Sequence, residues 1–158
     1  MTRYATTDDI PEIVRIINAA FRVEDFFIDG DRTSEADISA RMAEPDVRFL
    51  VIDSPEPGVL AATVMMDIHG GRGHFGMLSV DPPFQGKGLS RLLMNAVEER
   101  CREAGCSDLD IEIVNLREEL PAFYAANGFV PVSTEPFPEQ RKLRRDAHMV
   151  RMTKPLNT

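Results

Sequence analysis

A glycine-containing loop between a strand and a helix is the part of this sequence best suited to chemistry. It reads Val80-Asp81-Pro82-Pro83-Phe84-Gln85-Gly86-Lys87-Gly88-Leu89-Ser90-Arg91-Leu92-Leu93. Glycines let the backbone approach an anion closely, and the first N–H groups of a helix lack intrahelical partners. Because the helix dipole also favours negative charge at that end, the loop predicts a phosphate or pyrophosphate site.

Two common nucleotide-binding motifs do not fit this loop. A P-loop requires Ser or Thr directly after Lys87, where the sequence has Gly88, and it requires a further glycine upstream. A dinucleotide fingerprint requires a third glycine, where Arg91 stands. For the loop considered alone, a tight strand-to-helix turn that binds nothing remains the alternative.

The elements that must position the loop follow from hydrophobic periodicity. Apolar residues at helical spacing predict a helix from Gly88 to about Glu103, whose face toward the sheet is expected to carry Leu92, Leu93, Ala96 and Val97. Upstream, three successive strands are predicted at residues 49–52, 59–67 and 74–80. A further strand at 109–114 makes a parallel pair with the third strand through the crossover helix.

The remaining segments complete a mixed α/β sheet, mostly antiparallel, with helices on both faces. A strand at 2–5 precedes a helix that begins near Thr6 and is expected to face the core with Ile10, Ile13, Val14, Ile17 and Phe21. The other expected elements are a loop at 23–32, a helix at 34–42, a helix at 121–127, strands at 129–132 and 148–152, and a polar loop at 135–146. We expect residues 1–158 to form one domain.

Composition narrows the classes of partner. A net charge of −8 disfavours nucleic acid and mildly favours a cationic substrate such as an amine. No apolar run has the length of a membrane span and no secretory signal is visible, so a cytoplasmic protein without a membrane partner is expected. Cys101 and Cys106 lack the spacing of a zinc site and are expected to be reduced thiols, so no metal is predicted.

A second motif makes the loop more specific. Gln85-x-x-Gly88-x-Ser90 resembles motif A of the GNAT superfamily of acyl-CoA-dependent N-acetyltransferases. Asn115, followed by Phe123-Tyr124-Ala125-Ala126-Asn127-Gly128-Phe129, resembles motif B of the same superfamily. Ser90 stands where Gly or Ala is usual, and the gap from Asn115 to Tyr124 is about two residues longer than in many members. Two motifs in the right order are far more specific than one.

The resemblance implies a cofactor, acetyl-CoA, and a role for each matching residue. The backbone of Leu78, Ser79 and Val80 would pair with the pantetheine arm, between strands that splay apart. Asn115 would hydrogen-bond the pantetheine, and Phe123 would lie beside the cofactor. The pyrophosphate would be held by Gln85, Gly86, Lys87, Gly88, Leu89, Ser90 and Arg91.

The resemblance also implies acyl transfer to an amine, for which Tyr124 is the natural general acid. A phenol with a pKa of about 10 stays protonated at neutral pH and can donate to a leaving thiolate. A backbone N–H near Val80 is expected to stabilise the oxyanion. For the base, alternation along the strand places Asp110 and Glu112 on one face, and Glu112 is preferred. The other possible bases are Asp67, His69, His74 and Glu24.

Two loops are expected to flank the acceptor. Glu24, Phe26 and Phe27 are predicted to bind it, with a core role for the two rings as the alternative. The basic residues Arg141, Lys142, Arg144 and Arg145 would bind a carboxylate or phosphate, or form a solvated loop. The acceptor is expected to be a small-molecule or peptide primary amine, used by a monomer or a homodimer in a ternary complex. A non-catalytic acyl-CoA sensor is the alternative function.

Overall fold

Seven strands form one mixed sheet in the computed structural model, which describes residues 1–138 and 143–156. The strand order is β1-β2-β3-β4-β5-β7-β6, and every neighbouring pair is antiparallel except β4 and β5, which are parallel. The predicted mixed α/β fold is confirmed. The elements are β1 (Thr2–Tyr4), α1 (Ile10–Ala20), α2 (Glu35–Met42), β2 (Val47–Asp53), β3 (Leu60–His69), β4 (Arg72–Val80), α3 (Leu89–Glu103), β5 (Asp108–Val114), α4 (Leu120–Ala126), β6 (Val130–Pro136) and β7 (His148–Pro155).

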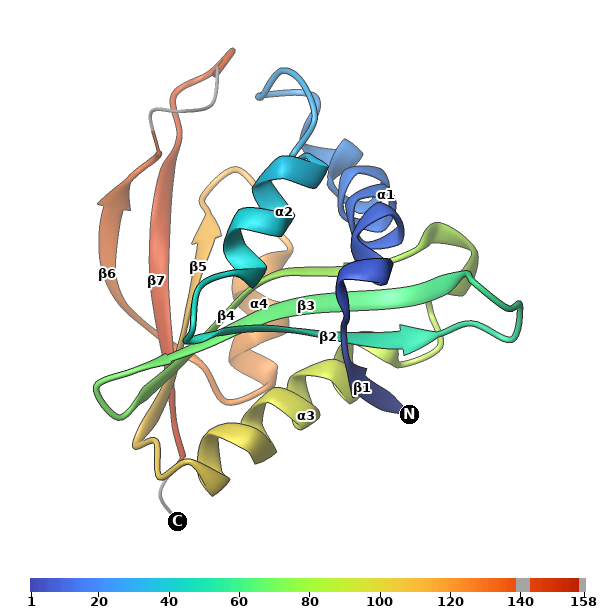
Figure 1. Cartoon of the computed structure of the whole chain (residues 1–158). Coiled ribbons are helices and arrows are strands. Elements are labelled where there is room, and N and C mark those ends of the chain that lie inside the picture. The colour runs from blue at the N-terminus through green and yellow to red at the C-terminus, as the bar shows by residue number, and fades with distance from the viewer. Residues whose placement is uncertain (139–142, 157–158) are drawn as a thin grey trace.

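Helices cover both faces of the sheet (Figure 1). On one face α1 packs on β3 and β4 and α2 packs on β2, around a cluster that includes Ile13, Ile17 and Ile38. On the other face α3 and α4 enclose a larger cluster that includes Leu93 and Tyr124. Burial of these apolar stripes is the main force that holds each helix against the sheet.

The helix ends form as their residues predict. The Thr6 N–H donates to the Asp9 carboxylate at 2.8 Å, just before α1 begins. The Ser34 hydroxyl accepts from the Asp37 N–H at 3.1 Å and so caps α2. After α3, Gly105 takes a left-handed conformation with φ of +80°, as a helix C-cap requires.

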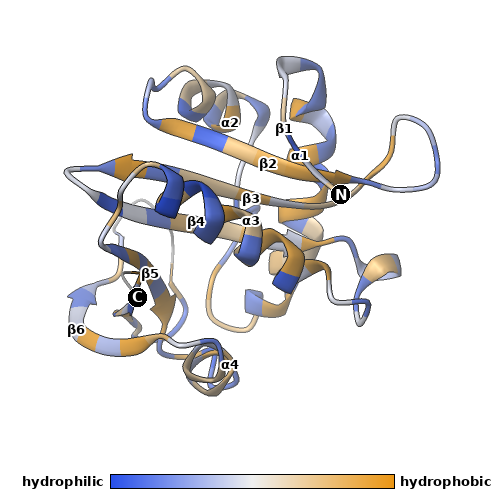
Figure 2. Ribbon diagram, turned by 90° about the horizontal axis from the view of Figure 1, so that it is seen from below, coloured by the Kyte–Doolittle hydropathy of each residue, from blue (hydrophilic) through white to orange (hydrophobic). Residues whose placement is uncertain are grey.

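One predicted core residue is wrong. Leu92 is 47% exposed, whereas Leu93 is fully buried and Met94, which the periodicity did not select, is also buried. The buried stripe of α3 therefore starts at Leu93 and continues through Val97 and Cys101. Hydrophilic residues occupy much of the visible face of this helix (Figure 2).

The last hairpin is longer than predicted. β6 continues past residue 132 because Thr134 pairs with Val150 and Pro136 pairs with His148. Six of the seven residues of β6 are exposed, so this edge strand carries no alternating apolar pattern that would reveal its length. The polar loop that was predicted at 135–146 therefore begins two residues later.

The junction of β4 and β5 is the feature of the fold that creates the site. Pairing is limited to Arg72–Asp108, Gly73–Leu109 and His74–Asp110, and beyond these pairs the two strands separate. In Figure 1, β5, β7 and β6 run in a clearly different direction from β2, β3 and β4. The sheet therefore opens between the second half of β4 and the second half of β5, as the resemblance implied.

Candidate active site

A cleft of about 570 Å³ opens beside the second half of β4, within the size range of small-molecule and cofactor sites. It is lined from the end of α1, the end of β4, the glycine loop, the start of α3, the β5–α4 loop and α4. Residues far apart in the sequence therefore share one cavity. The lining residues are Ala20, Phe21, Val23, Leu78, Ser79, Val80, Phe84, Gln85, Gly86, Gly88, Leu89, Ser90, Arg117, Glu119, Leu120, Phe123 and Tyr124.

A bulge shapes the β4 wall of the cleft. The register between β3 and β4 shifts between Thr63 and Met65, and Met77 adopts a left-handed conformation with φ of +55°. Such a conformation is uncommon for a residue other than glycine, and a bulge bends a strand and redirects the residues after it. The bulge thus directs the last three residues of β4, 78–80, along the cleft. No pattern in the sequence predicted it.

The glycine loop forms one end of the cleft and fits a pyrophosphate. Gly86 and Gly88 have φ of +78° and +79°, and a Cβ atom at either position would meet nothing within 4 Å. The backbone is therefore open where an anion would lie, and Gly88 is the N-cap of α3. The Gln85 side-chain amide donates to the Val80 carbonyl at 3.2 Å and so ties the loop to β4.

The charged side chains near the loop are consistent with an anion. The carboxylate of Asp81, at the start of the loop, is buried and ion-paired with Arg15 at 3.0 Å. Lys87 lies over the Phe84 ring at 5.8 Å. Lys87 and Arg91 are exposed and lie outside the set that lines the cleft.

Tyr124 lines the cleft from α4 and is 8% exposed. Its ring packs in an edge arrangement against Phe123 and Phe129, with ring centroids 5.1 Å and 5.6 Å away. Burial raises the pKa of Tyr124 to about 12, although the positive charge of Arg117 acts in the opposite direction. The phenol is therefore protonated at neutral pH and is able to donate a hydrogen bond or a proton.

Arg117 is a charged residue that lines the cleft and that the sequence analysis did not identify as functional. It lies in the β5–α4 loop, in the segment that is longer than in many family members, and its side chain is 18% exposed. Its guanidinium pairs with Glu24 at 3.2 Å and with Glu119 at 2.8 Å. In the sequence, only the unusual length of this loop could have drawn attention to it, and the length alone does not identify Arg117.

Glu112, the preferred base, lies beyond the last β4–β5 pair and is part of a three-residue network. His74 contacts Asp67 through Nδ1 at 2.8 Å and Glu112 through Nε2 at 3.0 Å. Burial by itself lowers the pKa of His74, but the hydrogen bonds with the two carboxylates outweigh it and raise the pKa to about 10. His74 is therefore cationic at neutral pH and donates to both carboxylates.

Asp110, on the same face of β5, is committed to a different network. Its buried carboxylate accepts hydrogen bonds from Arg72 at 2.8 Å, from Arg151 at 2.9 Å and from the Thr153 hydroxyl. The Arg72 guanidinium above all, and then Thr153 and Arg151, hold the pKa of Asp110 well below its usual range. A carboxylate with so low a pKa is a poor general base at neutral pH.

Glu112 and the remaining residues with a predicted role are not among those that line the cleft. Asn115 faces β7, where its Oδ1 accepts from the His148 N–H at 2.8 Å. Glu24 is buried beside Arg117. Phe27 is fully buried in a small cluster with Ile28 and Val114, the core position weighed as the alternative, and Phe26 is 46% exposed.

The loop before β7 contacts the segment between α1 and α2. Ile28 forms an isolated bridge with Leu143, and the Arg144 N–H donates to the Phe27 carbonyl at 2.7 Å. The Arg144 guanidinium also pairs with Asp29. Arg144 therefore joins two loops, whereas Arg141 and Lys142, of the same basic run, lie outside the described residues.

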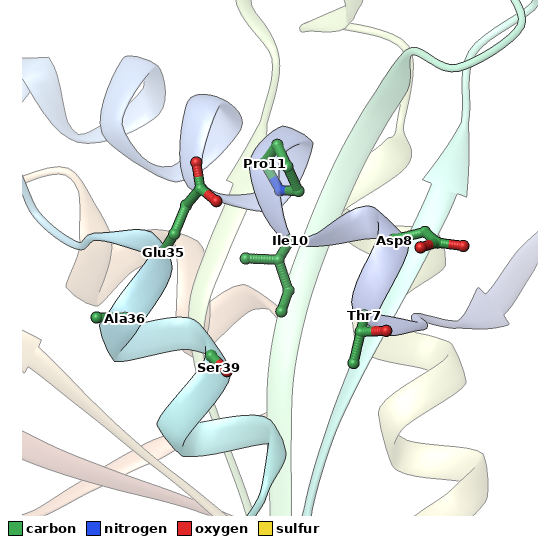
Figure 3. Close-up of a pocket in the computed structure, with 7 residues that line it drawn as sticks. All are labelled: Thr7, Asp8, Ile10, Pro11, Glu35, Ala36 and Ser39. Atoms are coloured by element: carbon green, nitrogen blue, oxygen red, sulfur yellow. The ribbon is translucent and has the colours of Figure 1, made fainter.

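A second hollow, lined from the start of α1 and from α2, lacks the features of the cleft. Figure 3 shows its lining residues, which are Thr7, Asp8, Ile10, Pro11, Glu35, Ala36 and Ser39. Its charged groups are both carboxylates, and it contains none of the residues that the motifs selected. Across residues 1–138 and 143–156, no cluster of His, Cys, Asp and Glu suited to a metal is present, and no helix is long and apolar enough to cross a membrane.

Comparison with known proteins agrees with the fold. Residues 10–129 match the family model described as the acetyltransferase (GNAT) family, and the chain belongs to this family. The matched range includes the whole cleft, from the end of α1 to Tyr124. The predicted family is thereby confirmed.

The most informative named relatives are acetyltransferases. Mycothiol acetyltransferase of Propionibacterium freudenreichii subsp. shermanii is 34% identical over 134 residues, which are 81% of this chain and 42% of that protein. IAA acetyltransferase of Azospirillum brasilense is 32% identical over 88 residues, which are 56% of this chain and 58% of that protein. The chain thus spans less than two thirds of the length of either relative.

Solved structures share the fold at low sequence identity. Ribosomal-protein-S18-alanine N-acetyltransferase from Escherichia coli aligns with a TM-score of 0.78 and 19% identity, over 100% of this chain and 94% of that chain. Ard1 from Thermoplasma volcanium aligns with a TM-score of 0.78 and 17% identity, over 100% and 98%. These similarities establish the fold.

Proposed function

We propose that residues 1–158 form one N-acetyltransferase domain that moves an acetyl group from acetyl-CoA to a primary amine of a small molecule or peptide. The observation that carries this proposal is that the glycine loop and Tyr124 line the same cleft. One feature suits a pyrophosphate and the other suits proton donation to a leaving thiolate. Membership of the GNAT acetyltransferase family supports the same reaction.

Each wall of the cleft is assigned a part of the cofactor. The N–H groups at the start of α3, with Gly86 and Gly88, bind the pyrophosphate. The β4 residues 78–80 offer backbone groups to the pantetheine, because β4 has no strand partner on the β5 side beyond His74. Phe123 supplies an apolar wall. Asn115 is expected to act through the position of β5 and β7, given its bonds to His148.

When bound, acetyl-CoA supplies a thioester, whose carbon forms a bond to the amine nitrogen while the C–S bond breaks and sulfur keeps the electron pair. Tyr124 gives its proton to that sulfur. Glu112, held by His74, receives the proton that the amine nitrogen loses, directly or through water. A backbone N–H near Val80 stabilises the carbonyl oxygen as its negative charge grows. Holding both substrates in one cleft supplies much of the rate.

The alternative is a non-catalytic module that binds acyl-CoA. The presence of Tyr124 in the cleft favours the enzyme, because binding alone does not require a protonated phenol there. A panel of amines with acetyl-CoA distinguishes the two functions. Because of the names of the relatives, the panel should include compounds related to mycothiol and peptides that carry alanine.

Acetylated products are detected by mass spectrometry, because a thiol acceptor would itself react with reagents for free thiols. An enzyme yields an acetylated amine and one equivalent of free CoA. Tight binding of acetyl-CoA with no product from any amine would favour the module instead. No binding would contradict both functions.

A further inference from the structure

Arg117 joins three parts of the site. Its guanidinium pairs with Glu24, from the segment between α1 and α2, and with Glu119, just before α4. Its own backbone is fixed, since its N–H donates to the Val114 carbonyl and its carbonyl accepts from the Leu120 N–H, both at 3.1 Å. The side chain is thus held at the wall of the cleft that Tyr124 also lines.

The charges around Arg117 differ in how strongly water screens them. The Glu119 side chain is 62% exposed, so water weakens its field, whereas the Glu24 side chain is 8% exposed. When the nearly buried Tyr124 loses a proton, negative charge forms in a poorly hydrated place, which is unfavourable unless a positive charge lies close. Arg117 lines the same cleft as Tyr124, and its positive charge opposes the effect of burial on the pKa of Tyr124.

We propose that Arg117 is a positioning residue of this site and acts through Tyr124, stabilising the phenolate oxygen as the proton passes to the departing sulfur. The proposal rests on the proposed function for the identity of the proton acceptor. In this step the O–H bond of Tyr124 breaks, an S–H bond forms with the electron pair that sulfur retained, and solvent returns a proton to the phenolate. Glu24, as the buried partner of Arg117, sets how much of its charge reaches Tyr124.

A titration of Tyr124 tests this directly, because the chain has two tyrosines and no tryptophan. In a Tyr4→Phe background, biosynthetic 3,5-difluorotyrosine places one reporter at position 124, and its greater acidity brings the titration into a range where the protein stays folded. Fluorine NMR then follows the phenol without acetyl-CoA or an acceptor. The result therefore does not depend on the proposed function.

The variants carry opposite expectations. Arg117→Gln is expected to raise the pKa of the reporter by about 1 unit, and Arg117→Lys to leave it within about 0.3 unit. Glu24→Gln is expected to lower it, because Arg117 then loses its buried carboxylate partner and keeps only the exposed Glu119. Arg48→Gln, which removes an exposed guanidinium in β2, serves as the control and is expected to change nothing.

Kinetics supply the second readout. With acetyl-CoA and an acceptor from the panel, Arg117→Gln is expected to lower kcat about 3- to 10-fold with little change in acetyl-CoA affinity. The loss should shrink for a donor whose thiol is a better leaving group. A folded Arg117→Gln protein with the parent pKa at Tyr124, or an equal loss of kcat for both donors, would overturn the proposal. Should this variant not fold, an unchanged pKa in Glu24→Gln would overturn it equally.

Discussion

The two ends of the β4–β5 junction use the same pair of strands in opposite ways. At the closed end, residues 72–74 pair with 108–110, and the buried carboxylate of Asp110 accepts hydrogen bonds from both neighbouring strands. At the open end, residues 78–80 of β4 face a cleft instead of β5. Backbone groups that a ladder satisfies at one end are thus available to a ligand at the other.

The difference shows how two neighbouring strands can separate at one end while the sheet stays intact at the other. A separated pair of strands exposes polar backbone, which is unfavourable unless other contacts hold the strands in place. Here the Asp110 network and the packing of Gly73 against Cys101 fix the closed end, since a Cβ on Gly73 would meet Cys101 Sγ at 2.4 Å. Stability is therefore expected to reside at one end and function at the other.

The largest effect is expected at the open end, from Tyr124→Phe. The ring is kept and the hydroxyl is lost, so folding should survive while kcat falls by about 10²- to 10⁴-fold, as for loss of a general acid. Steady-state kinetics and thermal melting check this together. Tyr4→Phe, at the exposed tyrosine of β1, is the matched control and should leave kcat unchanged. A folded Tyr124→Phe protein with wild-type turnover would make Tyr124 a structural residue.

The counterpart at the closed end is Asp110→Asn, which should cost stability. We expect about 3 kcal/mol in the free energy of unfolding at pH 7, at the low end for a broken buried pair, because Arg72 and Arg151 remain partly exposed to water. The pKa of Asp110 is lowered by folding, so its contribution is present above its unfolded pKa of about 4 and is lost as the pH falls further.

Urea unfolding at pH 7 and near pH 3 measures this prediction. Asp108→Asn, which loses a more exposed contact to Arg72, should cost less than about 1 kcal/mol. An Asp110→Asn cost that is equally small would show that the network does not hold the closed end.

Substitutions at two glycines with similar backbone conformations distinguish the loss of folding stability from the loss of acetyl-CoA affinity. Gly88→Ala and Gly58→Ala both place an L-residue at positive φ, +79° and +77°, with nothing within 4 Å of the new Cβ. Each should lose about 1–2 kcal/mol of stability. Only Gly88→Ala should weaken acetyl-CoA binding, about 10-fold by calorimetry, because the methyl group would point into the space left for the pyrophosphate. Equal affinities in the two variants would remove the loop from the site.

The smallest effect depends on pH and involves His74, which lies where the two ends meet. Folding raises the pKa of His74 to about 10, so its stabilising contribution is complete below an unfolded pKa of about 6.5 and is lost as the pH rises through 10. His74→Gln should cost roughly 1–2 kcal/mol at pH 6 and little at pH 10.

Unfolding at both pH values tests this, with His69→Gln as the exposed control. A cost that stays constant from pH 6 to pH 10 would mean that His74 contributes through packing rather than through its charge.

The sequence revealed the open end better than the closed end. Motif A and Tyr124 are local features, since a glycine loop before a helix and an aromatic pair before Gly128 are readable from neighbouring residues. The Asp110 network and the pairing of Arg117 with Glu24 join residues at least 38 positions apart and depend on strand register, which one sequence does not fix. The prediction that Leu92 faces the sheet was wrong because periodicity locates the buried stripe of a helix only to within about one residue on either side.

Backbone hydrogen exchange with and without acetyl-CoA tests the central claim most directly, namely that the open end of the junction binds the cofactor. Acetyl-CoA should slow exchange at the amides of residues 78–80 and 86–90 and leave residues 72–74 and 108–110 unchanged. Slower exchange at both ends alike, or no change at residues 78–80 when acetyl-CoA is saturating, would contradict the assignment of the cleft.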